Sequence, residues 1–365
     1  MIGFQFTPFK AGENSKTMFE QMLDLFTELL NYTNGDATEA LDWLNQLDRK
    51  HKFTNNDYGM GDFIEDLKEN GYLKENSPDG TFKITSKTEQ TIRKKSLEDI
   101  FGKLKKGSKG NHQTNKTGPS AELSPDTRAY QFGDNIDQVD FTESIRNAQI
   151  NHGVDHFRME ENDLLIRESD FKTQTSTVLM IDISHSMILY GEDRITPAKK
   201  VAMALCELIT TKYPKDTIDI VVFGNDAWSI EIKDLPYLQV GPYHTNTVAG
   251  LELAMDLLRR RKNPNKQIFM ITDGKPSCVK LPTGELYKNS NGLDEYIVSK
   301  CLNMAAQARK LKISITTFMI AQDPYLRQFV ERFTAENQGK AFLTGLSDLG
   351  QMIFEDYEKN RIKRI

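Results

Sequence analysis

The C-terminal half of the chain alternates short apolar runs with segments in which apolar residues recur every three or four positions. Residues 178–181 are continuously apolar, as expected of a central parallel strand buried on both faces. Further strands are predicted at 218–223, 267–272, 313–320 and 341–344, with an edge strand at 227–232. Helices are predicted at 196–213, 248–261, 293–310, 324–337 and 347–359. Repeated β-α units specify an α/β fold, a doubly wound and mostly parallel sheet with helices on both faces.

Residues 1–105 show the spacing of helices, interrupted by one hairpin. The helical segments lie within about 16–31, 41–47, 63–67 and 86–104. A Ser-Pro-Asp-Gly turn at 77–80 between two short strands predicts the hairpin. Ser86 followed by Glu89 is a capping box that opens the last helix. This order resembles a winged helix, so residues 1–105 are predicted to form a smaller, mainly helical interaction domain.

The segment between these two parts has little regular pattern. Residues 102–123 are rich in Gly, Lys, Asn and Thr and nearly free of apolar residues, which is typical of a mobile linker or exposed loop. The following residues are irregular apart from one helix predicted near 140–150. The chain therefore divides into the interaction domain (1–105), a flexible linker and irregular connector (106–174) and the α/β domain (175–365).

The charge balance argues against a nucleic-acid or anionic-membrane binder, because such proteins favour basic surfaces. The net charge is −5, and residues 1–105 hold 14 Lys and Arg against 18 Asp and Glu. The helix before the hairpin, where a recognition helix would lie, carries Asp62, Glu65, Asp66 and Glu69, which phosphates would repel. A basic cluster at 93–95 is more typical of a solvated helix face. We expect this domain to dock proteins.

The chain is expected to work in the cytoplasm. The N-terminus lacks a basic region followed by an apolar run, so no secretory signal is predicted. No apolar stretch reaches the roughly 18–20 residues that span a bilayer. Cys206, Cys278 and Cys301 are far apart and odd in number, which fits a reducing compartment better than a disulfide framework or a zinc site.

Polar residues gather where the predicted strands end. They are Asp182, Ser184 and Ser186 after strand 178–181, Thr245 before the 248–261 helix, and Asp273 after strand 267–272. Ligands of doubly wound sheets bind beyond the carboxyl ends of the strands, so these oxygens are expected to converge. A set of oxygens without imidazole or thiolate selects Mg²⁺, Mn²⁺ or Ca²⁺. A site that has few protein ligands and leaves room for several waters favours Mg²⁺ among these ions. Alternatively, the serines cap the next helix and Asp182 bonds backbone amides.

These five residues resemble the metal-ion-dependent adhesion site of von Willebrand factor A (vWA) and integrin I domains. That pattern is D-x-S-x-S, a loop Thr and T-D-G, and every position is occupied here. Thr245 rather than Thr247 matches the loop position, because Gly250 and Leu251 follow at the family's spacing. The resemblance implies an ion that keeps one coordination position for a partner's carboxylate. Two carboxylates roughly neutralise a divalent cation, which still attracts an incoming acid.

Residues 128–358 also look like the bacterial cytoplasmic CoxE-like group of vWA proteins. The matching stretches include 130–134, 144–148, 197–199, 266–268, 317–319 and 349–350, and residues 97–101 also look like a segment of that group's N-terminal region. The loop 278–294 departs from the group's pattern. Members accompany MoxR or magnesium-chelatase-type AAA+ ATPases. The resemblance implies an adaptor or co-chaperone whose partner, the ATPase or its substrate, supplies an Asp or Glu carboxylate.

Two alternatives remain open from the sequence. A metal-dependent phosphatase or hydrolase could use Asp182 as its nucleophile, but Ser184 stands where such phosphatases place an acid or base and is too weakly acidic for that role. A DNA-binding regulator could act through residues 1–105, against which the acidic helix argues. The leading hypothesis is a non-enzymatic, metal-dependent binding module without catalytic residues.

Overall fold

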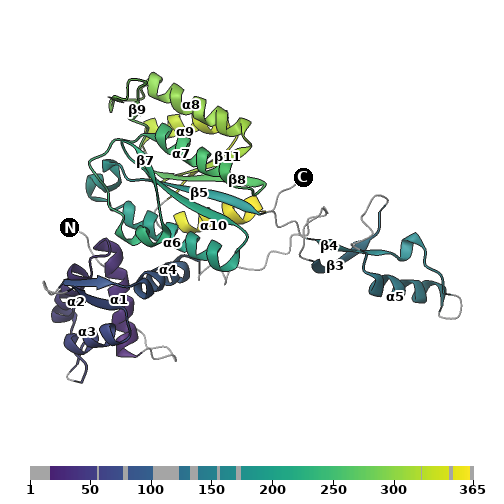
Figure 1. Ribbon diagram of the computed structural model, residues 1–365, viewed down its shortest axis with the longest axis horizontal. Coiled ribbons are helices and arrows are strands. Elements are labelled where there is room, and N and C mark those ends of the chain that lie inside the picture. The colour runs from purple at the N-terminus through teal and green to yellow at the C-terminus, as the bar shows by residue number, and fades with distance from the viewer. Residues whose placement is uncertain are drawn as a thin grey trace.

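The computed structural model describes residues 17–55, 57–76, 81–101, 123–131, 139–153, 157–169, 174–321, 323–344 and 348–361. Its centre is a six-stranded sheet in the order β12-β11-β8-β5-β6-β7 (Figure 1). Neighbouring strands run parallel except for β7, which pairs antiparallel with β6 at one edge. The α/β fold predicted from the apolar runs is therefore confirmed.

The strands of this sheet lie close to their predicted positions. They are β5 (Thr175–Asp182), β6 (Thr217–Phe223), β7 (Ala227–Ile230), β8 (Asn265–Thr272), β11 (Ile313–Met319) and β12 (Lys340–Leu343). The helices are α6 (Ile195–Lys212), α7 (Thr247–Arg260), α8 (Glu295–Lys310), α9 (Pro324–Asn337) and α10 (Leu349–Arg361). None of the helices in the described ranges has the length and apolarity needed to cross a bilayer.

One hairpin was not predicted. Strands β9 (Cys278–Lys280) and β10 (Leu286–Lys288) pair antiparallel within the loop that follows β8. Each has only three residues, which is too short to show an alternating pattern.

The three cysteines, Cys206, Cys278 and Cys301, are free and buried.

Helices cover both faces of the sheet (Figure 1). Val178 and Met180 belong to the core formed with α7, α8 and α9, whereas Leu179 and Ile181 belong to the core on the side of α6 and α10. All of β5 is buried, because successive side chains point to opposite faces and both faces are covered. This double cover explains the continuous apolar run in the sequence.

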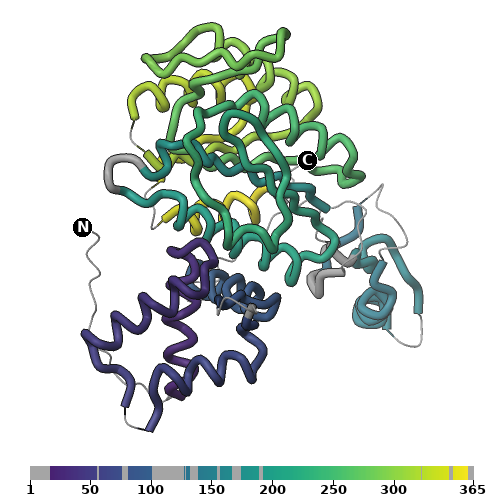
Figure 2. The backbone as a smooth tube through the Cα atoms, turned by 60° about the vertical axis from the view of Figure 1, so that its left-hand side comes forward, coloured from purple at the N-terminus to yellow at the C-terminus, as the bar shows by residue number. Residues whose placement is uncertain are grey.

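The N-terminal module has the predicted order of elements. These are α1 (Met18–Tyr32), α2 (Ala37–His51), α3 (Met60–Glu69), the hairpin of β1 (Leu73–Asn76) and β2 (Thr81–Ile84), and α4 (Ser86–Phe101). Figures 1 and 2 show the module against the side of the sheet that α6 covers. Its apolar residues and those of α6 and α10 form one continuous core. Helix α6 is therefore buried nearly all round, as a helix between two layers must be.

Lys199 links α6 to the N-terminal module from within this core. Its side chain is fully buried, and Nζ donates to the backbone oxygen of Asn31 at 3.1 Å and to Asn34 Oδ1 at 2.7 Å. A third acceptor is the backbone oxygen of Pro236 at 3.5 Å. Burial lowers the pKa of Lys199 to about 8.

Two side chains of the basic cluster at 93–95 contact other helices, Arg93 across to α6 and Lys95 within the N-terminal module. Arg93 Nε lies 3.4 Å from Glu207 Oε2 on α6, and Lys95 Nζ donates to the Thr27 hydroxyl on α1 at 3.2 Å. The prediction of a solvated face therefore holds only for Lys94, which is exposed. On α3, the acidic side chains of Asp62, Glu65 and Glu69 are exposed, as the argument against a DNA-binding face requires.

Residues 123–169 differ from the predicted irregular connector. Strand β3 (Leu123–Ala129) pairs antiparallel with β4 (Leu165–Ser169), and α5 (Phe141–His152) lies between them in the chain. The sequence of β3, Leu-Ser-Pro-Asp-Thr-Arg-Ala, gave no alternating signal. Figures 1 and 2 show this unit to one side of the main body. Most of the predicted linker, 102–122, lies outside the described residues.

The buried Lys199 predicts a pH-dependent stability. Its pKa is about 8 in the folded chain, against an ordinary 10.5. Between these values the unfolded chain binds the proton and the folded chain does not, so stability rises with pH, by at most about 3 kcal/mol. Urea unfolding from pH 7 to 10.5 should show the wild type gaining stability relative to Lys199→Met above pH 8.

The control for this experiment is Lys200→Met, which removes the neighbouring ammonium that pairs with Glu28 at the partly exposed edge of the same contact. A wild-type-minus-Lys199→Met difference that stays constant with pH would contradict the buried, titrating amine.

Candidate functional site

Strand β5 ends at Asp182, whose side chain is fully buried. Thr272, the last residue of the adjacent β8, donates its hydroxyl to Asp182 Oδ2 at 2.7 Å. The backbone N–H of Ser184 donates to Oδ1 at 2.9 Å. The parallel register, with Ile181 opposite Ile271, places the two strand ends side by side. Each oxygen of this carboxylate is thus held by a neutral donor.

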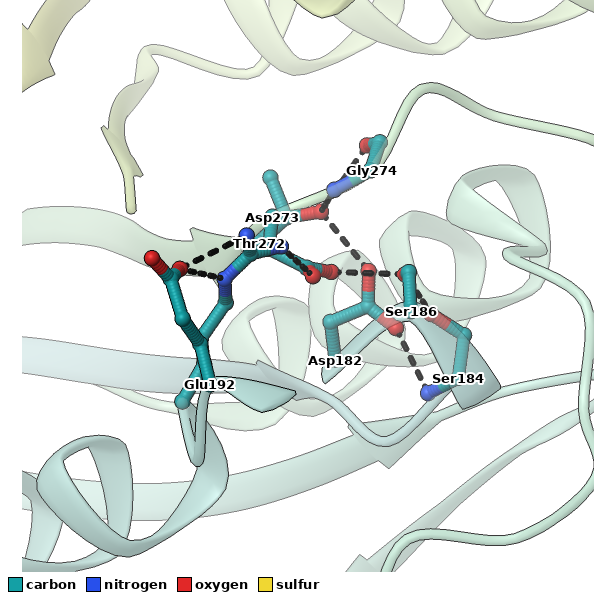
Figure 3. A network of polar contacts seen from close by, with 8 residues as sticks. Asp182, Ser184, Ser186, Glu192, Thr272, Asp273 and Gly274 are labelled. Atoms are coloured by element: carbon teal, nitrogen blue, oxygen red, sulfur yellow. Dashed lines mark hydrogen bonds and ion pairs between the residues drawn. The ribbon is translucent and has the colours of Figure 1, made fainter. Parts of the chain in front are cut away.

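Ser184, Ser186 and Asp273 continue the site as a chain of oxygens. Ser184 Oγ lies 3.0 Å from Ser186 Oγ, and Ser186 Oγ donates to Asp273 Oδ1 at 2.7 Å. Figure 3 shows these side chains and Asp182 pointing toward one another. Ser186 lies in the short 3-10 helix after β5 (His185–Gly191), and Asp273 directly follows β8. The two strand ends therefore supply four of the five predicted residues.

Thr245 reaches the same place from the loop before α7. Its backbone N–H donates to Ser277 Oγ at 3.0 Å, and its carbonyl accepts from the Ser277 N–H at 3.0 Å. A Cβ added at Gly274 would lie 3.1 Å from Ser186 Oγ and 3.4 Å from Thr245 Oγ1. Both hydroxyls thus border one small space, which glycine leaves open. The structure brings all five predicted residues together.

Arg194, at the start of α6, also contacts the site. Its Nη1 lies 2.7 Å from Asp273 Oδ2, so each oxygen of Asp273 has a different donor. Its Nε and Nη2 donate to Glu192 Oε2 at 3.1 and 2.9 Å.

The site opens into a pocket of about 780 Å³. Ser184, Ser186, Thr245 and Asp273 line it, and Asp182 lies behind them. Besides Asp273 and Tyr243, the ionisable side chains around it are those of His185, Arg194, His244, Lys275 and Asp323. Burial, followed by the charge of Lys288, lowers the pKa of His244, so this imidazole is neutral at pH 7.

The donor set fits a hard divalent cation. The five side chains offer only carboxylate and hydroxyl oxygens, the donors that Mg²⁺, Mn²⁺ and Ca²⁺ prefer. Burial, followed by the charge of Asp273, raises the pKa of Asp182 to about 7. A divalent cation would remove this conflict between two close carboxylates. No three His, Cys, Asp or Glu side chains in the described part of the chain could hold a metal together, so the hydroxyls would be needed.

Sequence reasoning missed two residues that shape the site. Arg194 lies in a short charged stretch, 192–194, which carries no spacing that points to Asp273. Ser277 holds the Thr245 loop through contacts between segments more than 30 residues apart. Neither contact follows from local pattern, because both depend on how the loops fold back over the sheet.

Comparison with known proteins identifies related families and relatives. The family model described as Rv0959-like protein, vWA domain, matches residues 175–358, and the model described as Rv0959-like protein, third domain, matches residues 122–169. The uncharacterized proteins Rv0959 of Mycobacterium tuberculosis (strain H37Rv) and Mb0984 of Mycobacterium bovis are each 26% identical over 309 residues. The match covers 81% of this chain and 44% of each relative. The chain thus spans less than half the length of these curated relatives.

Solved structures are similar at low sequence identity. The PilB minor pilin from Streptococcus sanguinis is 15% identical with a TM-score of 0.44, over 54% of this chain and 64% of that chain. A von Willebrand factor type A structure from Catenulispora acidiphila is 14% identical with a TM-score of 0.40, over 55% and 45%. These are likenesses of fold.

The hydroxyl of Thr272 should stabilise the buried end of β5. Thr272→Val leaves Asp182 Oδ2 without its donor, which should cost about 1–3 kcal/mol of unfolding free energy. Thr317→Val is the matched control, because the buried hydroxyl of Thr317 has no hydrogen-bond partner within the described part of the chain and its removal should cost almost nothing. Urea unfolding of both variants checks the difference; equal losses would show that the Thr272 hydroxyl is not bonded to the carboxylate.

Proposed function

Because this chain belongs to the Rv0959-like family of vWA-domain proteins, we propose that it binds a protein partner through a divalent cation at the carboxyl edge of its sheet. The residues that would hold the ion, Mg²⁺ in the first place, are Asp182, Ser184, Ser186, Thr245 and Asp273. A bound divalent ion supplies a Lewis-acidic centre that attracts a carboxylate. A partner's Asp or Glu would complete the coordination shell.

The observation that carries this proposal is the convergence of two buried carboxylates and three hydroxyls beside one open pocket. Thr272 and the Ser184 amide orient Asp182, and Ser277 positions the Thr245 loop. The oxygens are therefore arranged before any ion arrives, which reduces the ordering that binding must impose.

A binding role fits these residues better than hydrolysis does. Asp182, the candidate nucleophile, is fully buried, lies outside the pocket lining and has a donor on each oxygen. The hydroxyl of Ser184 is engaged with Ser186 and is too weakly acidic to serve as the general acid or base. We therefore propose a non-enzymatic module.

The partner that we propose is a MoxR or magnesium-chelatase-type AAA+ ATPase, or a substrate that it remodels, on the strength of the CoxE-like sequence pattern. In this role the chain is a cytoplasmic adaptor or co-chaperone. The exposed acidic face of α3 adds a second surface for protein docking and is unsuited to DNA.

The full chain should bind one Mg²⁺ or Mn²⁺ in calorimetric titration. Asp273→Asn should weaken binding at least about tenfold, since even outer partners of a metal contribute that much. Asp219→Asn is the matched control, because Asp219 also pairs with an arginine, Arg261, at 2.5–3.0 Å but lies near the start of β6, away from the site. Metal binding that persists in Asp273→Asn and Asp182→Asn would refute the site.

Partner capture should depend on the same ion. Immobilised full chain should retain a purified MoxR-type ATPase, or its substrate, in Mg²⁺ and release it in EDTA, because the proposed bond runs through the metal. Asp182→Asn should abolish retention and Asp219→Asn should preserve it. Capture that survives both EDTA and Asp182→Asn would mean that the partner binds elsewhere.

A further inference from the structure

The cluster of oxygens already holds one positive charge, which belongs to the chain itself. Arg194 is 12% exposed and its Nη1 lies 2.7 Å from Oδ2 of Asp273, whose side chain is 0% exposed. Arg194 also lines the pocket. The second partner of the guanidinium, Glu192, is 61% exposed.

We propose that Arg194 competes with the divalent cation for Asp273 and thereby sets the metal affinity of the site. The guanidinium neutralises Asp273. A cation that coordinates the same carboxylate must share it with Arg194 or displace the guanidinium toward Glu192. This inference rests on the metal site proposed above and adds a residue that determines how strongly the metal binds.

The electrostatics of the two carboxylates support this assignment. A buried carboxylate without a cation is costly, and an ion pair offsets that cost. Asp182 accepts from the neutral donors Ser184 and Thr272 and has no cationic partner among the residues that the structure describes. Asp273, in contrast, has Arg194. Arg194 thus neutralises one of the two carboxylates, and an arriving cation gains less from Asp273 than it would from an unpaired carboxylate.

Glu192 is a second acceptor that could hold the guanidinium of Arg194 after it leaves Asp273. It accepts from Nε and Nη2, whereas Asp273 accepts from Nη1. Because the two acceptors use different nitrogens, Arg194 can lose Asp273 and keep Glu192. The displaced guanidinium would remain beside the pocket with a free donor for an incoming carboxylate, the ligand class that arginine binds best.

Metal titrations of the full chain separate this role from a structural one. Arg194→Gln should bind Mg²⁺ and Mn²⁺ about tenfold more tightly than the wild type, because a competing positive charge is gone. Its metal-free melting temperature should fall, and the rise in melting temperature on adding metal should exceed that of the wild type. Arg261→Gln removes the matched arginine of the Asp219 pair and should leave the metal affinity unchanged.

Arg194→Lys should bind the metal with intermediate affinity, because lysine keeps the charge but pairs less strongly than the planar guanidinium. If Arg194→Gln does not fold, tighter binding by Arg194→Lys supports the proposal and equal or weaker binding overturns it. Unchanged or weaker metal binding in a folded Arg194→Gln also overturns it.

The outcomes distinguish this inference from the proposed function. A wild type that binds metal while Arg194→Gln binds no better leaves the metal site standing and removes only the role of Arg194. A wild type that binds no metal, beside an Arg194→Gln variant that does, refutes the proposed function and supports Arg194 as the dominant cation. Absence of binding in both refutes both.

Discussion

The central constraint in this structure is that two parallel strands, β5 and β8, end side by side in the middle of the sheet. Their register fixes Asp182 beside Thr272, and the next residue is Asp273. Two carboxylates are therefore brought together in a largely buried place, where each needs compensation. This compensation comes in part from Arg194 and Ser186, which both contact Asp273. Ser184 and the Thr245 loop complete the surroundings of the two acids.

The two carboxylates differ in the charge of their hydrogen-bond donors. Asp182 is surrounded by neutral donors and belongs to the protein interior, whereas Asp273 faces the pocket and has a cationic neighbour. In the function proposed above, Asp182 would orient the site and Asp273 would exchange Arg194 for the cation, a division suited to reversible binding.

Much of the fold was predictable because a strand that is buried on both faces is a continuous apolar run in the sequence. The run at 178–181 and its counterparts identify the strands of the central sheet, and the residues that follow them identify the edge where a ligand would bind. Four of the five candidate residues could be named because strand ends in a parallel sheet have a known common edge, whereas Thr245 was assigned from the spacing of the family that the sequence resembles. Their convergence in space follows from topology more than from any local signal.

The remaining features depend on contacts that sequence pattern does not carry. Strand β3 pairs with β4 across about 40 residues and contains a proline and two charged residues, so it lacks the alternation of a half-buried strand. Arg93 and Lys95 looked like a solvated face because their partners, Glu207 and Thr27, lie on other helices. The pairing of Arg194 with Asp273 spans 79 positions. Each of these contacts follows from the packing of elements that are far apart in the sequence.

Helix α6 has a consequence for the geometry of assembly. Its outer side is occupied by the chain's own N-terminal module, anchored by the buried amine of Lys199. A protein bound at the pocket, as proposed above, therefore finds this side of α6 already covered. The pocket itself has no residue from the described part of the module in its lining, so the module closes one face of the domain and leaves the carboxyl edge of the sheet to a partner.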